Sequence, residues 1–296
     1  MRFQDLPKKW KRKVIVLSAV IILLLFAIGL FNVFLAFYRK SCADMRAVLV
    51  KTDEDLIGER IEIEREDGAS VEANLYTSDS IGAEPFPVVF NIHGGGFVGG
   101  DADVLDTQSE RISKEWDVIV VTVNYTKADV RPILYGAGEI RDIVLYFADN
   151  ADKYHADSSR FTLMGYSAGA YYASEATRLL QKENFDMASL VMCYPWTTGL
   201  NVKKLDEDFP RTFFVLAGND PISQKAKPYI DSMNAVGIET ETIEYENAVH
   251  SFIESNNPEG MTGSSEDMSN VINTEQESLA RQAEARICDW IKTNGN

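Results

Sequence analysis

The pentapeptide Gly165-Tyr166-Ser167-Ala168-Gly169 is the strongest signal for chemistry in the sequence. It follows an apolar strand candidate at 160–164 and opens a helical stretch at 168–181, which is the context that a nucleophile elbow requires. Glycines on both sides permit a very tight turn, while the serine takes strained backbone angles that expose its hydroxyl. The free N–H groups of the helix then point at the same place. We therefore predict that Ser167 is a nucleophile.

The glycine loop His93-Gly94-Gly95-Gly96 is a second, independent signal, because it closes a strand candidate at 86–92. Backbone N–H groups of consecutive glycines can approach a developing oxyanion with no Cβ in the way. The loss of one such donor typically costs about 3 kcal/mol of transition-state stabilisation. The alternatives are a plain glycine-rich turn and a phosphate-binding loop, but the Gly-Lys-Ser/Thr of a phosphate loop is absent.

These motifs resemble the hormone-sensitive-lipase-like esterases of the α/β-hydrolases, a group that includes arylacetamide deacetylase and many bacterial acetyl esterases. The resemblance covers roughly residues 87–250 and extends to Asn124-Tyr125, Asp157-Ser158-Ser159-Arg160 and Tyr194-Pro195-Trp196. It implies a catalytic triad in the chain order serine, acid, histidine. It also implies acyl transfer that needs no cofactor and no metal.

Three histidines are candidates for the general base. His93 belongs to the glycine loop, where the family uses it structurally, and His155 lies in a polar turn before the nucleophile, where we expect a surface residue. His250 follows the last strand candidate, and His250-Ser251-Phe252 resembles the family's His-Gly-Phe, with Ser251 as a departure. We therefore expect His250 to be the base.

Asp220 is the candidate acid, because Ala217-Gly218-Asn219-Asp220-Pro221-Ile222 closes a strand candidate and resembles the family's Gly-x-x-Asp-Pro, here with one residue fewer after the glycine. Asp220 lies 30 residues before His250. A carboxylate at the end of a strand can reach an imidazole on the next loop. The alternative is that Asp220 only forms an Asx-Pro turn. Asp206, Asp208 and Asp231 are expected to be solvated charges.

The remaining site residues are expected from their places in these motifs. The oxyanion is expected to contact the N–H of Ala168 and of two among Gly94, Gly95 and Gly96. The candidate substrate walls are Tyr125, Tyr166, Trp196 and the polar loop at 254–274.

The substrate is expected to be a neutral, short-chain ester, such as an acetyl group on a sugar. Only residues 197–210 are available for a lid, so we predict a small lid and an open cleft. The acidic character of the chain after residue 40 disfavours anionic lipids.

Short β-branched runs alternate with helical stretches through most of the chain. The strand candidates are 86–92, 118–124, 160–164, 190–194, 212–217 and 240–245, and the helix candidates are 107–116, 133–154, 168–181, 224–235 and 275–291. This alternation implies parallel pairing through right-handed crossovers. A hairpin at 59–64 and 71–76 is expected at the sheet edge. We predict a three-layer α/β sandwich whose mostly parallel sheet carries the site at the carboxyl ends of its strands.

An uncharged apolar run at 14–38 precedes this domain and is long enough to cross a bilayer as one helix. Six basic residues lie before the run and two directly follow it. The positive-inside bias therefore predicts a cytoplasmic tail (1–13), a membrane anchor (14–38), a linker (39–58) and an extracytoplasmic catalytic domain (59–296). The alternative is a cleaved signal peptide, because Ser41-Cys42-Ala43 has small residues at the positions that signal peptidase reads.

The charge of the chain excludes a nucleic-acid partner. Residues 1–40 contain eight of the 29 Lys and Arg residues and one of the 45 Asp and Glu residues, which leaves 21 basic against 44 acidic residues after them. Such a surface repels phosphate backbones. The three cysteines have no metal-ligand spacing. Besides the esterase, an amidase or exopeptidase on the same fold and a non-catalytic adhesion module remain as alternatives.

Overall fold

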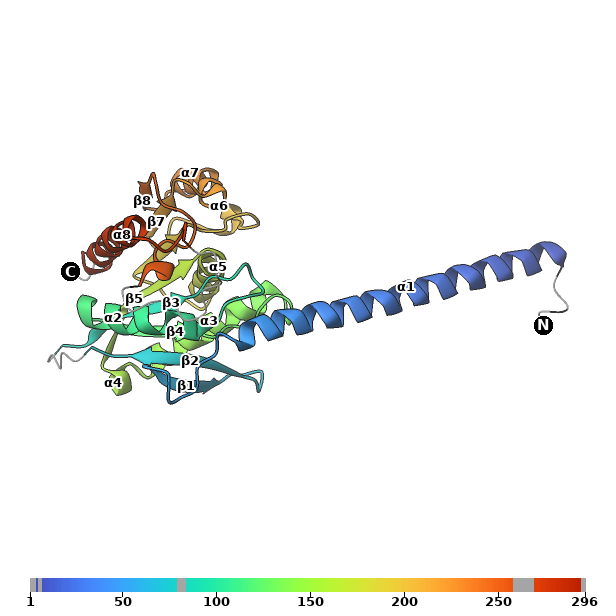
Figure 1. The fold of residues 1–296 in the computed structure, drawn as a ribbon, viewed down its shortest axis with the longest axis horizontal. Helices are drawn as coiled ribbons and strands as arrows, with labels where there is room; N and C mark the ends of the chain where they lie inside the picture. Colours follow the sequence, from blue (N-terminus) through green and yellow to red (C-terminus); the bar gives the residue numbers. More distant parts are fainter. Residues whose placement is uncertain (1–3, 5–6, 79–83, 258–268, 294–296) are drawn as a thin grey trace. The chain divides into compact units, whose positions relative to one another are not determined.

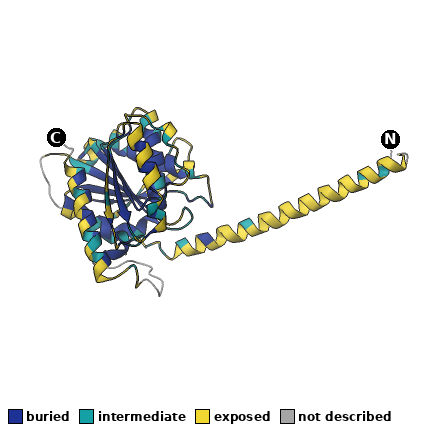
Figure 2. Cartoon of the chain, turned by 90° about the horizontal axis from the view of Figure 1, so that it is seen from above, coloured by how far each residue is buried: buried dark blue, intermediate teal, exposed yellow. Residues whose placement is uncertain are grey.

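The computed structural model describes residues 4, 7–78, 84–257 and 269–293. The contacts within the chain divide it into two compact units, Met1–Met45 and Arg46–Asn296. The first unit consists largely of α1 (Lys8–Ala47), whose apolar side chains are exposed (Figure 2). The helix predicted at 14–38 is confirmed and is longer at both ends. Its length and composition suffice for a membrane span, and a signal sequence has the same properties.

The second unit is built on an eight-stranded sheet in the described residues, with the strand order β1-β2-β4-β3-β5-β6-β7-β8 (Figure 1). The strands are β1 (Glu59–Glu64), β2 (Ser70–Tyr76), β3 (Phe86–Ile92), β4 (Ile119–Val123), β5 (Ala156–Tyr166), β6 (Ser189–Cys193), β7 (Thr212–Ala217) and β8 (Thr240–Tyr245). β1 and β2 form the predicted antiparallel hairpin at the edge, β2 pairs antiparallel with β4, and the other pairs are parallel. The mostly parallel α/β fold is therefore confirmed.

Helices cover both faces of this sheet. α3 (Ile133–Asp149), α5 (Ala168–Lys182) and α7 (Lys227–Ala235) pack into one apolar core, and α2 (Asp106–Trp116) and α8 (Thr274–Lys292) pack into the other. Every residue of β4, β6 and β7 is buried, as expected for parallel strands that are covered on both faces. Figure 2 shows these buried strands between helices whose outer faces are exposed.

Besides α1, three predicted elements differ from the structure by more than one residue at an end. The helix expected at 133–154 ends at Asp149 and is followed by the short α4 (Ala151–Tyr154). The helix expected at 224–235 is divided into α6 (Pro221–Gln224) and α7, with Pro228 in the first turn of α7, where a missing N–H breaks no helical hydrogen bond. β5 is also longer than the apolar run 160–164 that predicted it.

The segment 46–58, which we expected to be part of a linker, is bonded to the second unit, and we call it the strap. Arg46 donates to both carboxylate oxygens of Asp129, at 2.9 and 3.2 Å, and to the carbonyl oxygen of Val98 at 2.5 Å. Val98 lies two residues after the glycine loop. The beginning of the strap is therefore attached beside that loop.

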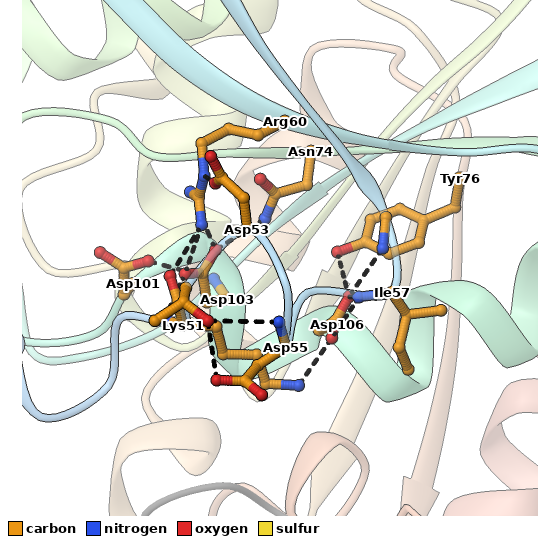
Figure 3. A network of polar contacts seen from close by, with 12 residues as sticks. Lys51, Asp53, Asp55, Ile57, Arg60, Asn74, Tyr76, Asp101, Asp103 and Asp106 are labelled. Carbon is orange, nitrogen blue, oxygen red and sulfur yellow. Dashed lines mark hydrogen bonds and ion pairs between the residues drawn. The ribbon is translucent and has the colours of Figure 1, made fainter.

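Two buried carboxylates hold the rest of the strap (Figure 3). Asp103 lies in η2 (Ala102–Leu105) and accepts from the backbone N–H of Lys51 at 2.8 Å and from Arg60 at 3.0 Å. Asp106 begins α2 and accepts from the Lys51 ammonium at 2.6 Å and from the Tyr76 hydroxyl at 3.0 Å. Strap, hairpin and the segment after the glycine loop are thereby joined in one polar network.

Arg60 offers a matched test of this network, because it pairs with the buried Asp103 and with Asp53, whose side chain is 83% exposed. We expect Asp103→Asn to lower the free energy of unfolding by about 3–5 kcal/mol, since it leaves a partly buried guanidinium without its buried counter-charge. Asp53→Asn should cost less than about 1 kcal/mol. Chemical denaturation of both variants measures the difference, and equal losses would contradict the role assigned to Asp103.

Candidate active site

The turn between β5 and α5 places Ser167 at the carboxyl end of the sheet. Ser167 has φ 53° and ψ −116°, and its backbone N–H donates to the carbonyl of Cys193 at 3.0 Å. A Cβ on Gly169 would lie 2.3 Å from the carbonyl oxygen of Ile92, a distance that real Cβ atoms do not adopt. Glycine is thus required there for α5 to pack against the end of β3, and this packing holds the serine in its left-handed conformation.

His250 bridges the other two members of the predicted triad. Its Nε2 lies 2.8 Å from Ser167 Oγ, and its Nδ1 lies 2.6 Å from Asp220 Oδ2. The three residues are far apart in the sequence, and each lies beyond the end of a different strand: β5, β7 and β8. The arrangement is that of a nucleophile, a base and the acid that orients the base.

Asp220 is buried and is fixed by the start of α6 as well as by His250. Its oxygens accept from the backbone N–H groups of Ile222 at 2.9 Å and Ser223 at 3.1 Å. Burial alone raises the pKa of a carboxyl group, but the hydrogen bonds from His250 and from these N–H groups outweigh it. The pKa of Asp220 therefore lies below its ordinary value, and the ionised form holds the His250 Nδ1 proton.

The glycine loop lies against the serine. Gly94, Gly95 and Gly96 all line one cleft with Ser167 and His250, and its volume is about 400 Å³. Gly95 has φ 130°, and a Cβ there would lie 2.2 Å from the carbonyl oxygen of Gly99. The loop thus folds back on itself beside Ser167. Ala168, the fourth residue expected at the oxyanion, begins α5, so its N–H belongs to the first turn, which has no partner within the helix.

Two of the three predicted substrate walls do not face the cleft. Tyr125 is buried, stacks on His93 with 4.4 Å between ring centroids, and donates its hydroxyl to the carbonyl of His93 at 2.8 Å. Tyr166 is buried beneath the elbow, with its hydroxyl 3.3 Å from the side-chain oxygen of Gln108. Both side chains are packed into the core, Tyr125 in one apolar cluster and Tyr166 in the other. Of the three aromatic residues, Trp196 lines the cleft as expected.

The other histidines have the expected places. His93 is buried, and its Nδ1 lies 2.6 Å from the carbonyl oxygen of Gly94. Burial also lowers the pKa of this imidazole well below its usual value. His155 is exposed in the turn before β5. Among the described residues, no group of three or more His, Cys, Asp or Glu side chains could hold a metal ion.

Two cleft residues were not recognised individually from the sequence. Leu49, from the strap, lines the cleft together with Val104 and Leu105, and no motif marks it, since its place depends on the ion pairs of the strap. Glu254 also lines the cleft, at the start of the loop 254–274 that we expected to form a wall. Residues 258–268 of that loop lie outside the described residues.

The expected small lid, residues 197–210, begins beside α7. Its first residues and α7 together line a second groove of about 560 Å³. That groove is lined in part by Thr197, Asn201, Lys203 and Tyr229, and no triad residue lines it.

Comparisons with known proteins agree with this geometry. The profile of a family described as "alpha/beta hydrolase fold" matches residues 89–208, which include the glycine loop and the elbow. The chain has the α/β-hydrolase fold. Among solved structures, an esterase from the fungus Rhizomucor miehei superimposes with a TM-score of 0.67 at 16% identity, covering 88% of this chain and 92% of that one. The metagenomic carboxylesterase EstE1 gives 0.66 at 20% identity, covering 87% and 98%.

Two proteins are similar to this chain in sequence. The alpha/beta hydrolase R526 of Acanthamoeba polyphaga mimivirus is 22% identical over 211 residues, which are 56% of this chain and 61% of that protein. Esterase LipI of Mycobacterium tuberculosis is 24% identical over 210 residues, which are 56% and 66% of the two chains. The match thus spans less than two thirds of either relative. The resemblance of this α/β-hydrolase to the hormone-sensitive-lipase-like esterases is confirmed, and the likeness to arylacetamide deacetylase stays a prediction.

Proposed function

We propose that this α/β-hydrolase is a membrane-anchored serine esterase that cleaves short-chain carboxylic esters outside the cytoplasm. The observation that carries the proposal is the pair of contacts from His250 to Ser167 Oγ and to Asp220. The esterase activity is also supported by a sequence relative and by solved structures of the same fold that are esterases.

The reaction proceeds through an acyl-enzyme. His250 Nε2 takes the proton of Ser167 Oγ as the oxygen attacks the ester carbonyl, and Asp220 stabilises the imidazolium that forms. The N–H groups of Ala168 and of the glycine loop hold the oxyanion. His250 then gives the proton to the departing alcohol. A water molecule, deprotonated by His250 in its turn, releases the acid and restores Ser167.

An amidase on the same site is the second candidate, because acyl transfer from amides uses the same residues and differs in the protonation of a poorer leaving group. Hydrolysis of p-nitrophenyl acetate compared with an aminoacyl anilide distinguishes the two. A non-catalytic adhesion module predicts that neither substrate is turned over.

Replacement of the nucleophile tests the mechanism. We expect Ser167→Ala to reduce kcat for p-nitrophenyl acetate at least about a thousandfold and to abolish labelling by a fluorophosphonate, whereas Ser232→Ala, at an exposed serine on α7, changes neither. Because the triad acts as a unit, Ser167→Ala combined with His250→Ala should be about as slow as either single variant. Undiminished labelling of Ser167→Ala would refute the assignment.

Acyl chain length tests the size of the cleft. We expect kcat/KM to be greatest for acetyl to butyryl esters and to fall by about eight carbons, because methylenes beyond the cleft remain in water, and only a covered methylene contributes its roughly 0.8 kcal/mol. Leu49→Ala should lower kcat/KM for the butyryl ester several-fold. Val48→Ala, a neighbour that is 77% exposed, is the control. A steady rise toward long chains would indicate a lipase instead.

Protease protection tests the topology. The six basic residues before the apolar run favour a cytoplasmic N-terminus. We therefore expect a protease added from the cytoplasmic side of sealed membranes to leave the Ser167 domain intact and labelled by fluorophosphonate. Digestion of the domain from that side would reverse the orientation.

A further inference from the structure

The catalytic cleft contains one carboxyl group that the mechanism above does not use. Glu254 begins η4 (Glu254–Asn256), four residues after His250, and lines the cleft with Ser167 and Trp196. The residue is half-buried as a whole, and its carboxyl group is held in the wall of the cleft by Tyr194. None of the described residues that line the cleft is an Asp, Lys or Arg.

The partners of Glu254 differ from those of three buried carboxylates of the chain. Asp103, Asp106 and Glu284 pair with Arg60, Lys51 and Arg111, respectively. In the described residues, the side-chain contact of the Glu254 carboxylate is instead the uncharged hydroxyl of Tyr194, which donates to it. Burial raises the pKa of Glu254 to about 8, as expected for a carboxyl group without a positive partner.

Two further features of the site suit a positively charged ligand. The ring of Trp196 lines the same cleft, and aromatic faces attract ammonium groups through the ring quadrupole. The chain after residue 40 has 44 acidic against 21 basic residues, so its field raises the local concentration of cations. A carboxylate and an aromatic ring in one cleft are the elements that recognise an ammonium group.

We propose that Glu254 and Trp196 form a cation subsite and that the ester cleaved at Ser167 carries an ammonium group. The proposal rests on the esterase function proposed above and names its substrate class. The ammonium group supplies the positive partner that Glu254 lacks, and it is not altered by the hydrolysis of the ester bond.

Two esters that differ only in charge test the subsite in the full-length chain. Acetylthiocholine carries a quaternary ammonium group, and S-(3,3-dimethylbutyl) thioacetate is its uncharged isostere. We expect the wild type to favour the cationic ester on the order of tenfold in kcat/KM, and Glu254→Gln to lose most of this ratio. Glu246→Gln removes the same charge from an exposed residue and should keep the ratio. A loss that is equal for both esters would mean that Glu254 only supports the site, and would overturn the proposal.

The ratio should also depend on pH, because Glu254 attracts a cation only when it is ionised. The titratable groups around it are Cys193 at the end of β6, Tyr194 directly after it, Tyr166 at the end of β5, and His250 on its own loop; Glu284 of α8 acts on Cys193 and Tyr166. His250 is present in both the wild type and Glu254→Gln, so the comparison of the two isolates the contribution of Glu254. We expect the ratio to rise more steeply from pH 6.5 to 9 in the wild type than in Glu254→Gln. A wild-type ratio without pH dependence would contradict this assignment.

A labelling experiment distinguishes failure of the proposed cation subsite from failure of the proposed esterase function. It measures whether a bound cation protects Ser167 from a fluorophosphonate. Tetramethylammonium should slow fluorophosphonate labelling of Ser167 in the wild type more than in Glu254→Gln. If the neutral ester is hydrolysed and Ser167 is labelled without protection by the cation, the subsite is wrong and the esterase function stands. If neither ester is hydrolysed and Ser167 is not labelled, the esterase function itself is wrong.

Discussion

The left-handed backbone of Ser167 is the constraint on which the site depends. A serine with φ 53° is strained, and it is kept there because α5 packs against the end of β3 at Gly169. The same close packing places the glycine loop, which continues β3, beside the serine. Ser167 and the glycine loop are thus positioned by one contact between a helix and a strand end, and the central strands beneath them are buried on both faces.

A second set of interactions fixes the other side of the cleft. The segment after the glycine loop carries Asp103 and Asp106, and their charges are satisfied by Lys51 and Arg60. These carboxylates do no chemistry. They keep the strap against the domain, so that Leu49 becomes part of the cleft wall. A buried ion pair costs desolvation, and its value here lies in fixing one position of the chain.

Much of this could be read from the sequence, because the informative residues are local. The elbow and the glycine loop follow their strands directly, and the alternation of apolar runs with helical stretches predicted the parallel sheet. The tyrosine walls were wrong because a motif does not tell which face of the sheet a side chain meets. Tyr125 and Tyr166 lie next to chemical residues in the chain but point into the core. Leu49 and the strap could not be predicted, since their places depend on ion pairs between residues up to 83 positions apart.

The position of the strap determines whether proteolytic cleavage after the apolar helix would change the cleft. Its attachment begins at Arg46, after the small residues Ser41-Cys42-Ala43. A signal peptidase acting at that place would release the domain with every strap contact still available, so the anchored and the released forms would have the same cleft wall. A shorter fragment that begins after Leu49 would lack that wall while retaining Ser167, Asp220 and His250. Such a fragment would be a poor guide to the natural substrate, even if it turned over simple esters.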